Sequence, residues 1–355
     1  MNRLTPYLRF VCPAAVACAA AACSGSTAPT PTPPPPPPPA ALVIACPTDQ
    51  TMQSTTAQPI PVAYPAATST GGTPPTQIVC TPASGAVFNV GTTPVNCTAT
   101  DSKSVTDKCS FNVTLTLPPK ISLTSFVAFG DSMTAGEVRS ETTVAKSEGG
   151  FQLIRPLVLD PTKAYPTHLL AELRARYTGQ AGAIAVDNAG LYGETAVAGA
   201  KRLPSVIDGG RYSAVLLMEG VNDFPDYRAA LAGMSDMVQY ASKRRGLRVY
   251  LATEPPENPS PVGCPDKLGG NWAFVAPYND GLRSIAASQG VTLVDVNAAF
   301  NGDVTTLIDC DGLHPTPAGY QLIADTFFKS IQSTLEVAAP PTPTALRIAP
   351  ARRSR

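Results

Sequence analysis

The chain has 355 residues, and its 44% apolar content is enough to bury a sizeable core. Charged residues make up only 15% of it, and its 26 Lys and Arg residues balance its 26 Asp and Glu residues. Because the chain has no basic surplus, we expect no nucleic-acid partner. The length suits two domains, and much of the proline lies in one tract, which indicates a linker.

The first 22 residues have the pattern of an export signal. Arg3 and Arg9 precede an apolar run over 11–22 that is too short to cross a bilayer as a mature helix. We therefore predict a signal peptide over 1–22. The alanines before Cys23 resemble the lipobox of bacterial lipoproteins, with alanine in place of the usual leucine three places before the cysteine. This resemblance implies a lipid on Cys23 that anchors the protein to a membrane of the cell envelope; the alternative is plain cleavage and secretion.

Residues 23–41 contain the proline tract, and we predict that they form an extended, semi-rigid linker. The chain has nine cysteines, of which the signal peptide would remove Cys12 and Cys18 and lipidation would occupy Cys23. The remaining six can pair completely in an oxidising compartment. Four of these six lie within 46–109, where three connectivities stay open.

Residues 42–118 are predicted to form a separate small β-sandwich, because short Val, Thr and Phe runs alternate with Gly, Pro, Asn and Asp turns. The segment resembles the hyalin-repeat (HYR) family of immunoglobulin-like modules in its Cys-Pro start, its Ser-Gly and Val-Gly-Thr-Thr turns and its Ala-Thr-Asp stretch before a final cysteine. The matching positions are Cys46-Pro47, Ser84-Gly85, 90–93, 99–101 and Cys109. A rigid spacer is the favoured role, and adhesion or presentation of a substrate is the alternative.

Residues 121–336 have the pattern of an α/β domain, and residues 337–355, which lack an apolar period, are predicted to be a disordered tail. Continuously apolar runs alternate with stretches of helical period, as strands buried on both faces do. We therefore predict a parallel sheet of about five strands with helices on both sides. The predicted strands lie in 124–130, 183–190, 213–220, 248–256 and 291–296, and the predicted helices in 165–177, 226–246 and 273–290.

Ser132 follows the first of these strands, at the end of the sheet where such folds bind ligands. A serine becomes a nucleophile when a base removes its proton, and the base is usually a histidine oriented by a carboxylate. His168 lies at a spacing that suits a helix face and is predicted to be structural. His314 lies three residues after Asp311, so one short turn can present both an imidazole and the carboxylate that orients it.

Two further strand ends offer hydrogen-bond donors for the oxyanion that forms during acyl transfer. Gly190 offers an unshielded backbone N–H, and Asn222 offers a side-chain amide. Each has a simpler explanation when taken alone, since glycine ends strands and Asn-Asp makes turns. The G-x-S-x-G motif of the other large class of serine hydrolases is absent, because Thr134 stands at the second glycine position.

Together these residues resemble the four sequence blocks of the SGNH (GDSL) hydrolase family. The blocks are Gly130-Asp131-Ser132, Gly190 in "DNAG", Gly220-Val221-Asn222-Asp223, and Asp311-Gly312-Leu313-His314-Pro315. The resemblance implies a three-layer α/β/α, flavodoxin-like fold, with Ser132 as nucleophile, His314 as base and Asp311 as its orienter. It also implies an oxyanion hole of Ser132, Gly190 and Asn222. Met133 departs from the family's common leucine without touching the catalytic set.

The sequence therefore predicts an exported serine ester hydrolase, of carboxylesterase or lipase type, that acts on an acyl ester and needs no cofactor or metal. One alternative is a carbohydrate acetylesterase that the HYR-like module directs to polysaccharide. The other is a surface adhesion protein whose hydrolase fold is vestigial. A fluorophosphonate probe separates the last from the first two.

Two features outside the four blocks also carry predictions. The long connection over 137–164 is rich in apolar residues, and we expect Phe151 and Leu157 to line an acyl pocket or lid rather than simply to pack on the sheet. Cys264 lies in the loop after the fourth strand, and Cys310 directly precedes Asp311. Loops that leave neighbouring parallel strands meet at one edge, so we expect these two cysteines to form a disulfide; two buried free thiols are the alternative.

Overall fold

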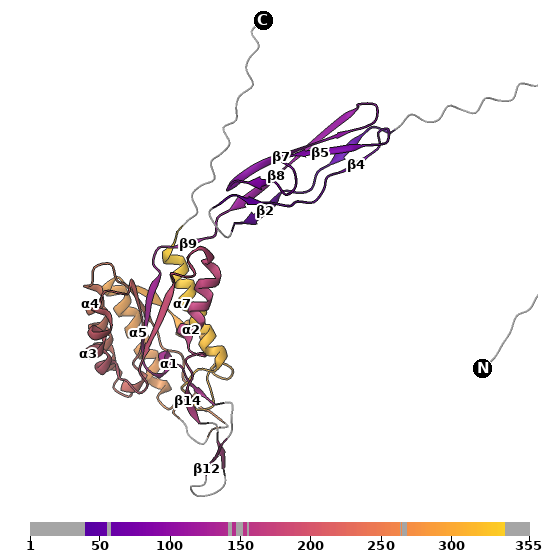
Figure 1. Cartoon of the computed structure of the whole chain (residues 1–355). Coiled ribbons are helices and arrows are strands. Elements are labelled where there is room, and N and C mark those ends of the chain that lie inside the picture. Colours follow the sequence, from indigo (N-terminus) through magenta and orange to yellow (C-terminus); the bar gives the residue numbers. More distant parts are fainter. Residues whose placement is uncertain are drawn as a thin grey trace, which may run out of the picture.

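The computed structural model describes residues 40–54, 58–140, 144–146, 152–154, 156–262, 264 and 268–337. These residues form a β-rich unit followed by an α/β domain, which Figure 1 shows joined near β9 (Lys120–Ile121). The predicted signal peptide, Cys23, Phe151 and the residues after 337 lie outside the described ranges.

The β-rich unit contains one four-stranded sheet in the order β2-β8-β7-β5 and two short antiparallel pairs, β1-β4 and β3-β6. Its strands are β1 (Val43–Ala45), β2 (Gln50–Gln53), β3 (Ile60–Pro61), β4 (Thr68–Thr70), β5 (Gln77–Thr81), β6 (Val87–Phe88), β7 (Gly91–Thr100) and β8 (Thr106–Thr116). Alternate residues of β7, namely Val95, Cys97 and Ala99, are buried in a core shared with Ile44 of β1 and with Val62, which directly follows β3. One core between two layers of strands is the arrangement of a small sandwich, as predicted.

Two disulfides cross-link this unit and decide the connectivity that the sequence left open. Cys46 pairs with Cys109, and Cys80 pairs with Cys97. Cys97 lies opposite Cys80 in the register of β5 and β7 and opposite Cys109 in the register of β7 and β8. The register therefore permits either neighbour, and the disulfide joins Cys97 to Cys80.

The α/β domain is built on a parallel five-stranded sheet in the order β15-β10-β16-β17-β18, which confirms the predicted sheet. Its strands are β10 (Ser125–Gly130), β15 (Ala185–Gly190), β16 (Ala214–Met218), β17 (Arg248–Ala252) and β18 (Thr292–Val294). Each lies inside one of the five apolar runs of the sequence. Every residue of the central strand β16 is buried, which explains why its run is apolar without alternation.

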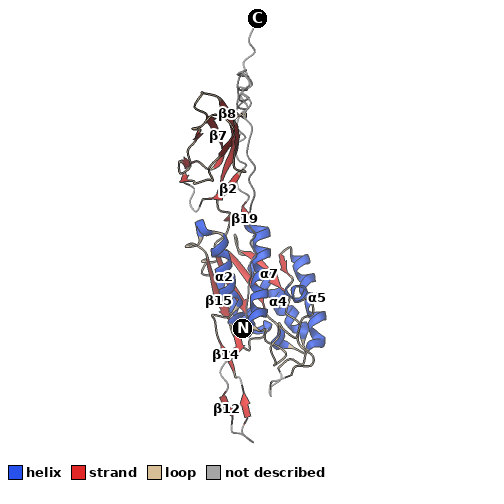
Figure 2. Cartoon of the chain, turned by 90° about the vertical axis from the view of Figure 1, so that its right-hand side faces the viewer, coloured by secondary structure: helices blue, strands red, loops and turns tan. Residues whose placement is uncertain are grey.

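Helices cover both faces of this sheet, as Figures 1 and 2 show. On one side α2 packs on α7, and on the other α4 packs on both α3 and α5. The helices are α1 (Ser132–Ala135), α2 (Tyr165–Arg176), α3 (Ala196–Ile207), α4 (Tyr227–Ser242), α5 (Trp272–Gln289), α6 (Val296–Phe300) and α7 (Pro317–Leu335), with short 3₁₀ turns η1 (Thr178–Gln180) and η2 (Val221–Asp223). α3 lies outside the helices predicted from the sequence, because Gly199 and Pro204 weaken its helical pattern.

The connection after Ser132 begins with the strand β11 (Glu137–Arg139). β11 pairs antiparallel with β14 (Leu157–Leu159), and β12 (Val144–Lys146) pairs with β13 (Gln152–Ile154). Figure 1 shows β12 beyond β14, away from the sheet. A last pair, β9 with β19 (Glu336–Val337), joins the two ends of the domain.

The predicted third disulfide is formed, and it joins Cys264 to Cys310 with 5.3 Å between their Cα atoms. Among the described helices, none is both long and apolar enough to cross a membrane.

Candidate active site

The turn after β10 presents Ser132 to a cavity. Asp131 caps the short helix α1 by accepting a hydrogen bond from the Met133 N–H at 3.0 Å, so Ser132 becomes the first helical residue. A side chain on Gly130 would collide with the Met218 carbonyl oxygen of the neighbouring strand. Glycine at 130 therefore lets the strand pass close to β16 and turn sharply into α1.

A second turn brings a histidine to this serine from 182 residues further along the chain. Nε2 of His314 lies 3.0 Å from Oγ of Ser132, and Nδ1 lies 2.9 Å from Oδ2 of Asp311. Oδ1 of Asp311 accepts the backbone N–H groups of Leu313 and His314, which fixes the carboxylate within its own turn. Gly312 has a φ of +85°, which a residue with a side chain rarely adopts, and this bend allows the turn.

The surroundings of the pair favour an ionised carboxylate beside a charged imidazole. Burial opposes ionisation of Asp311, but hydrogen bonds from the His314 ring and from two backbone N–H groups hold its pKa below the usual value. Burial likewise opposes the charged form of His314, but hydrogen bonds to Asp311 and Glu137 raise its pKa to about 9. The imidazole is therefore strongly basic where it stands.

The cavity at Ser132 has a volume of about 290 Å³ and contains three of the predicted site residues, Ser132, Asn222 and His314. The other residues that line it are Glu137, Tyr192, Gly193, Val221, Phe224, Glu257, Leu268, Asn271 and Leu313. Asn222 lies on η2 and donates one amide hydrogen to the Glu194 carbonyl oxygen at 2.9 Å. An amide nitrogen carries two hydrogens, so one remains for a ligand.

The structure gives the backbone N–H of Gly190, a predicted oxyanion donor, a partner within the protein. This N–H donates to Oδ1 of Asn188 at 2.9 Å, and Gly190 is not among the residues that line the cavity. A side chain there would collide with Ala135 in α1, so Gly190 gives room for the helix that carries the nucleophile. The glycine that lines the cavity is Gly193, three residues later, with a φ of +71°. The predicted donor Gly190 is the last residue of β15, whereas the chain reaches the cavity in the loop that follows this strand.

Other predicted residues lie elsewhere. Leu157 lies on β14 opposite Arg139 and is not part of the cavity wall, and Phe151 lies outside the described residues. His168 lies on α2 and does not line the cavity, which agrees with its predicted structural role.

Two charged residues on β11 contact the His314–Asp311 pair, and the sequence analysis did not single them out. Oε2 of Glu137 lies 3.1 Å from Nε2 of His314, and Nη2 of Arg139 lies 3.5 Å from Oδ2 of Asp311. Their spacing of two residues puts both side chains on one face of the strand. That spacing is the only signal of this arrangement in the sequence. Tertiary packing decides which face of β11 lies against His314.

Three buried carboxyl groups lie at the carboxyl ends of the central strands: Asp131, Glu219 and Glu254. Burial raises the pKa of Asp131 to about 6 and that of Glu219 to about 10, and it raises the pKa of Glu254 well above its ordinary value. Glu219 is therefore protonated at neutral pH and adds little negative charge beside Asp131, and burial disfavours the charged form of Glu254.

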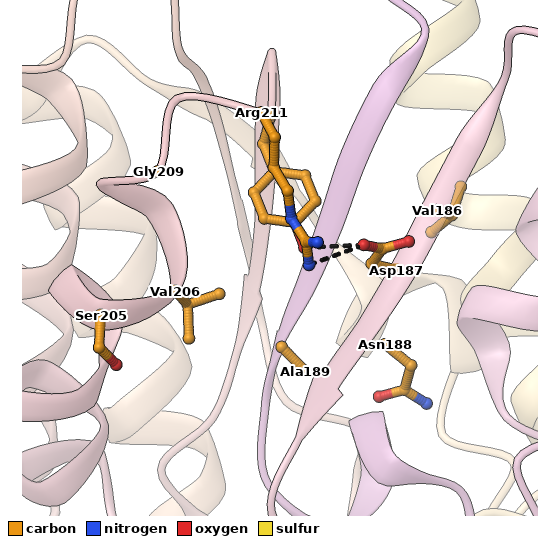
Figure 3. Close-up of a pocket in the computed structure, with 9 residues that line it drawn as sticks. Val186, Asp187, Asn188, Ala189, Ser205, Val206, Gly209 and Arg211 are labelled. Atoms are coloured by element: carbon orange, nitrogen blue, oxygen red, sulfur yellow. Dashed lines mark hydrogen bonds and ion pairs between the residues drawn. The ribbon is translucent and has the colours of Figure 1, made fainter.

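A larger cavity of about 730 Å³ lies along the edge strand β15, as Figure 3 shows. Its wall includes Ser205 but neither histidine. Arg211 and Asp187 in this wall point toward each other and form an ion pair of 3.0 Å. Of these two cavities, the smaller is the one in which a lining serine contacts a histidine.

One group of potential metal ligands occurs within the described ranges: Cys264, Asp309 and Cys310. Both cysteines are joined in the disulfide, so neither offers a thiolate, and the group does not fit a metal site.

Comparison with known families agrees with this geometry. Residues 128–322, more than half of the chain, match the GDSL-like lipase/acylhydrolase family. The chain belongs to this family. Residues 37–115 match the HYR domain. As a GDSL-like acylhydrolase the protein hydrolyses ester bonds, and its disulfides and HYR domain are features of proteins that work outside the cytoplasm.

Solved structures of other hydrolases are similar to this GDSL-like protein. They include the α/β-hydrolase enzyme LAE5 from the metagenome of Lake Arreo (24% identity, 60% of this chain, 98% of that chain, TM-score 0.44). A lipase/acylhydrolase from Enterococcus faecalis has 19% identity, with 60% and 97% coverage and a TM-score of 0.45. The acetylxylan esterase Axe2 from Geobacillus stearothermophilus has 21% identity, with 59% and 96% coverage and a TM-score of 0.43. No curated protein matches the chain.

Proposed function

We propose that the protein cleaves acyl esters through a triad of Ser132, His314 and Asp311 and a covalent acyl-enzyme. The supporting observation is the hydrogen-bond chain from Oγ of Ser132 through the His314 ring to Asp311, with links of 3.0 and 2.9 Å. Nε2 of His314 removes the Oγ proton as Oγ attacks the acyl carbon. The same nitrogen then donates this proton to the leaving alcohol, and water releases the acyl group by the reverse sequence.

We further propose that the oxyanion is bound by the N–H groups of Ser132 and Gly193 and by the amide of Asn222. Ser132 is the first residue of α1, where helical N–H groups have no partner within the helix. Gly193 and Asn222 line the same cavity. This set replaces Gly190 of the sequence-based prediction with Gly193.

The cavity favours small acyl groups. At about 290 Å³ it is at the lower end of the volumes that small-molecule sites have, roughly 300 to 1,000 Å³. We therefore propose short-chain esters as substrates, with the alcohol part directed outward.

A carbohydrate acetylesterase is the second candidate, and two exposed aromatic residues favour it. Tyr192 lines the cavity with 64% of its surface exposed, and Trp272, which follows the cavity residue Asn271, is 54% exposed. Exposed aromatic faces beside a small acyl site suit the flat apolar faces of sugar rings. An adhesion protein with a vestigial hydrolase fold is not favoured, because the hydrogen bonds of the proposed triad are complete.

The test compares p-nitrophenyl esters of rising acyl length with acetylated xylan, using the purified chain and its Ser132→Ala variant. Loss of the serine should lower kcat for the best substrate at least about 1,000-fold. Ser205→Ala, in the larger cavity, is the matched control and should retain activity. Equal rates for Ser132→Ala and the wild type would contradict the mechanism. Preference for acetylated xylan over every small ester would select the second candidate.

We also propose that residues 1–22 are a signal peptide and 23–41 a linker, with a lipid on Cys23, and that residues 42–118 and 121–336 form the two domains. If Cys23 carries a lipid, the full-length product should partition into detergent, and Cys23→Ser should release it to the aqueous phase. A wild-type product that is already soluble outside the cell would contradict the anchor and favour plain secretion.

A further inference from the structure

Glu137 occupies a position beside the proposed base that the triad mechanism does not use. Nε2 of His314 lies 3.1 Å from Oε2 of Glu137 and 3.0 Å from Oγ of Ser132. A neutral imidazole that donates from Nδ1 to Asp311 has a bare lone pair on Nε2, which a carboxylate would repel. A proton on Nε2 turns this contact into a charge-assisted hydrogen bond. The contact with Glu137 therefore favours the protonated ring.

The backbone of Glu137 is held from two sides, while its carboxylate reaches the cavity. β11 pairs with β14 on one side, and the Tyr320 hydroxyl of α7 donates to the Glu137 carbonyl oxygen at 2.7 Å on the other. The Glu137 side chain lines the cavity and is 18% exposed, so it can be displaced without movement of the strand.

Charges alternate along the four contacting side chains. Arg139 contacts Asp311, Asp311 contacts His314, and His314 contacts Glu137. When His314 is protonated, each of these contacts joins two opposite charges. Arg139 and Asp311 are almost completely buried, and Arg139 contacts Oδ2 of Asp311, the oxygen that also contacts Nδ1 of His314. Glu137 is then the carboxylate whose removal changes the charge around Nε2 without exposing Asp311.

The other groups that face His314 act in the same direction or are neutral. Asp131, behind the nucleophile, attracts the imidazolium electrostatically, and burial raises the pKa of Asp131 itself to about 6. Tyr320 is buried beside Asp131, Glu137 and Asp311, and burial keeps its pKa well above the ordinary value, so it stays neutral. Ser132 is neutral, and Arg139 reaches the ring only through Asp311.

We propose that Glu137 is a positioning residue that holds the Nε2 proton of His314 in the free enzyme and thereby sets the pH at which Ser132 can be activated. The proposal rests on the proposed function of His314 as base. Activation consists of the loss of the Nε2 proton to water, which leaves the nitrogen lone pair facing the Ser132 O–H. The alcohol oxygen of a bound ester must later approach Nε2 to receive a proton, so the substrate displaces the Glu137 carboxylate from that place.

This assignment predicts an enzyme that is most active at alkaline pH. Glu137 should determine the pH range over which kcat/KM falls on the acid side. Both hydrogen bonds to carboxylates contribute to a His314 pKa of about 9, so kcat/KM should rise with pH up to that value. Glu137→Gln preserves the shape of the side chain and removes its charge. We expect it to lower the pKa of His314 by about one unit or more, which increases kcat/KM at pH 7 roughly tenfold.

The experiment is an NMR titration of the histidine ring in the full chain, with Ser132→Ala as the common background so that no turnover occurs. The chain has only two histidines, and the signal lost in His314→Asn identifies the ring of interest. Glu257→Gln is the matched control, because Glu257 lines the same cavity but accepts hydrogen bonds from Gly270 and Asn271. It should move the His314 midpoint by less than about 0.3 unit, against about one unit for Glu137→Gln.

An equal His314 midpoint in Glu137→Gln and Glu257→Gln would overturn the proposal. If Glu137→Gln does not fold, Glu137→Asp replaces it, since the shorter carboxylate retreats from Nε2 and should lower the midpoint by a smaller amount. The titration does not depend on turnover. Esterase activity that survives Ser132→Ala would therefore contradict the proposed function, while the midpoints would still decide the role of Glu137.

Discussion

Arg139 and Asp311 form an ion pair of 3.5 Å in which the two side chains are 1% and 0% exposed. Asp311 also accepts hydrogen bonds from the His314 ring and from two backbone N–H groups, so Arg139 adds a positive charge to an already constrained carboxylate. The pair places a positive charge beside a buried carboxylate whose pKa is held low by the His314 ring and the two backbone N–H groups.

Replacement of this arginine should destabilise the domain. Arg139→Met removes one partner of a buried ion pair and leaves Asp311 with only the His314 ring as counter-charge, and loss of one partner of such a pair typically costs about 3 to 5 kcal/mol in the free energy of unfolding. Urea denaturation measures the loss. Arg211→Met is the control, because the Arg211–Asp187 pair is 68% and 46% exposed and should contribute less than about 1 kcal/mol. Equal losses in the two variants would contradict the structural role of Arg139.

The disulfide between Cys264 and Cys310 should matter to catalysis as well as to stability. Cys310 precedes Asp311, whose carbonyl oxygen accepts the N–H groups of Leu268 and Gly269 from the same loop as Cys264. Replacement of both cysteines by serine removes a cross-link between residues 46 apart, for which chain-entropy models give about 4 kcal/mol at most. We expect lower kcat as well, because small displacements of the base reduce turnover strongly.

The Cys80–Cys97 disulfide provides the control for that experiment. Its replacement by serines should lower the unfolding temperature of the β-rich unit and leave the esterase kinetics unchanged. If loss of Cys264–Cys310 also leaves kcat unchanged, the bridge stabilises the loop without positioning His314.

Glu219 should make the stability of the domain fall as pH rises. Burial raises its pKa to about 10 in the folded state, whereas in the unfolded chain the group ionises at its ordinary value of 4.5. Between these values the unfolded chain has lost a proton that the folded protein keeps, so raising the pH favours unfolding. The full contribution of the protonated group is present below 4.5 and is lost as pH rises toward about 10.

Glu219→Gln tests this sign. The amide cannot ionise, so the variant should gain stability relative to the wild type at pH 8, on the order of 1 to 3 kcal/mol, and gain less at pH 5. Gly199 of α3 leaves the space that the Glu219 carboxyl fills, so the similarly sized amide fits. Denaturant titrations at the two pH values measure the difference, and a gain that is larger at pH 5 would contradict the assignment.

Asn222 should contribute to the transition state more than to substrate binding. Loss of one oxyanion donor typically lowers kcat by about 100- to 1,000-fold, so Asn222→Ala should lose activity mainly in kcat. Steady-state kinetics on a short p-nitrophenyl ester separate kcat from KM.

Asn188→Ala distinguishes the two glycines. Its side chain accepts the Gly190 N–H, so the variant frees that N–H without touching Gly193. If Gly193 is the donor, kcat should remain within about threefold of the wild type, well below the effect of losing a donor. A large change in kcat in a folded variant would restore Gly190 as a candidate.

The features of this fold that could be predicted from the sequence are those that depend on residues close together in the chain. The inner strands β10 and β16 lie in continuously apolar runs, because a strand buried on both faces must be apolar throughout, whereas the edge strand β15 is only partly buried and contains Asp187 and Asn188. The Asp311–His314 contact was also predictable, since one short turn contains both residues. The Cys264–Cys310 bridge followed from topology, because loops from neighbouring parallel strands share one edge.

Tertiary structure alone decided the remaining features. Gly190 and Gly193 are both loop-compatible glycines, and only the path of the chain after β15 places Gly193 at the cavity. Leu157 is an apolar residue of the kind that lines acyl pockets. In the structure, however, it lies on β14 opposite Arg139 of β11 and is not part of the cavity wall. Glu137 and Arg139 are ordinary charged residues in sequence. They contact His314 and Asp311 because β11 packs against a turn that is more than 170 residues away along the chain, and no local pattern encodes a contact over that separation.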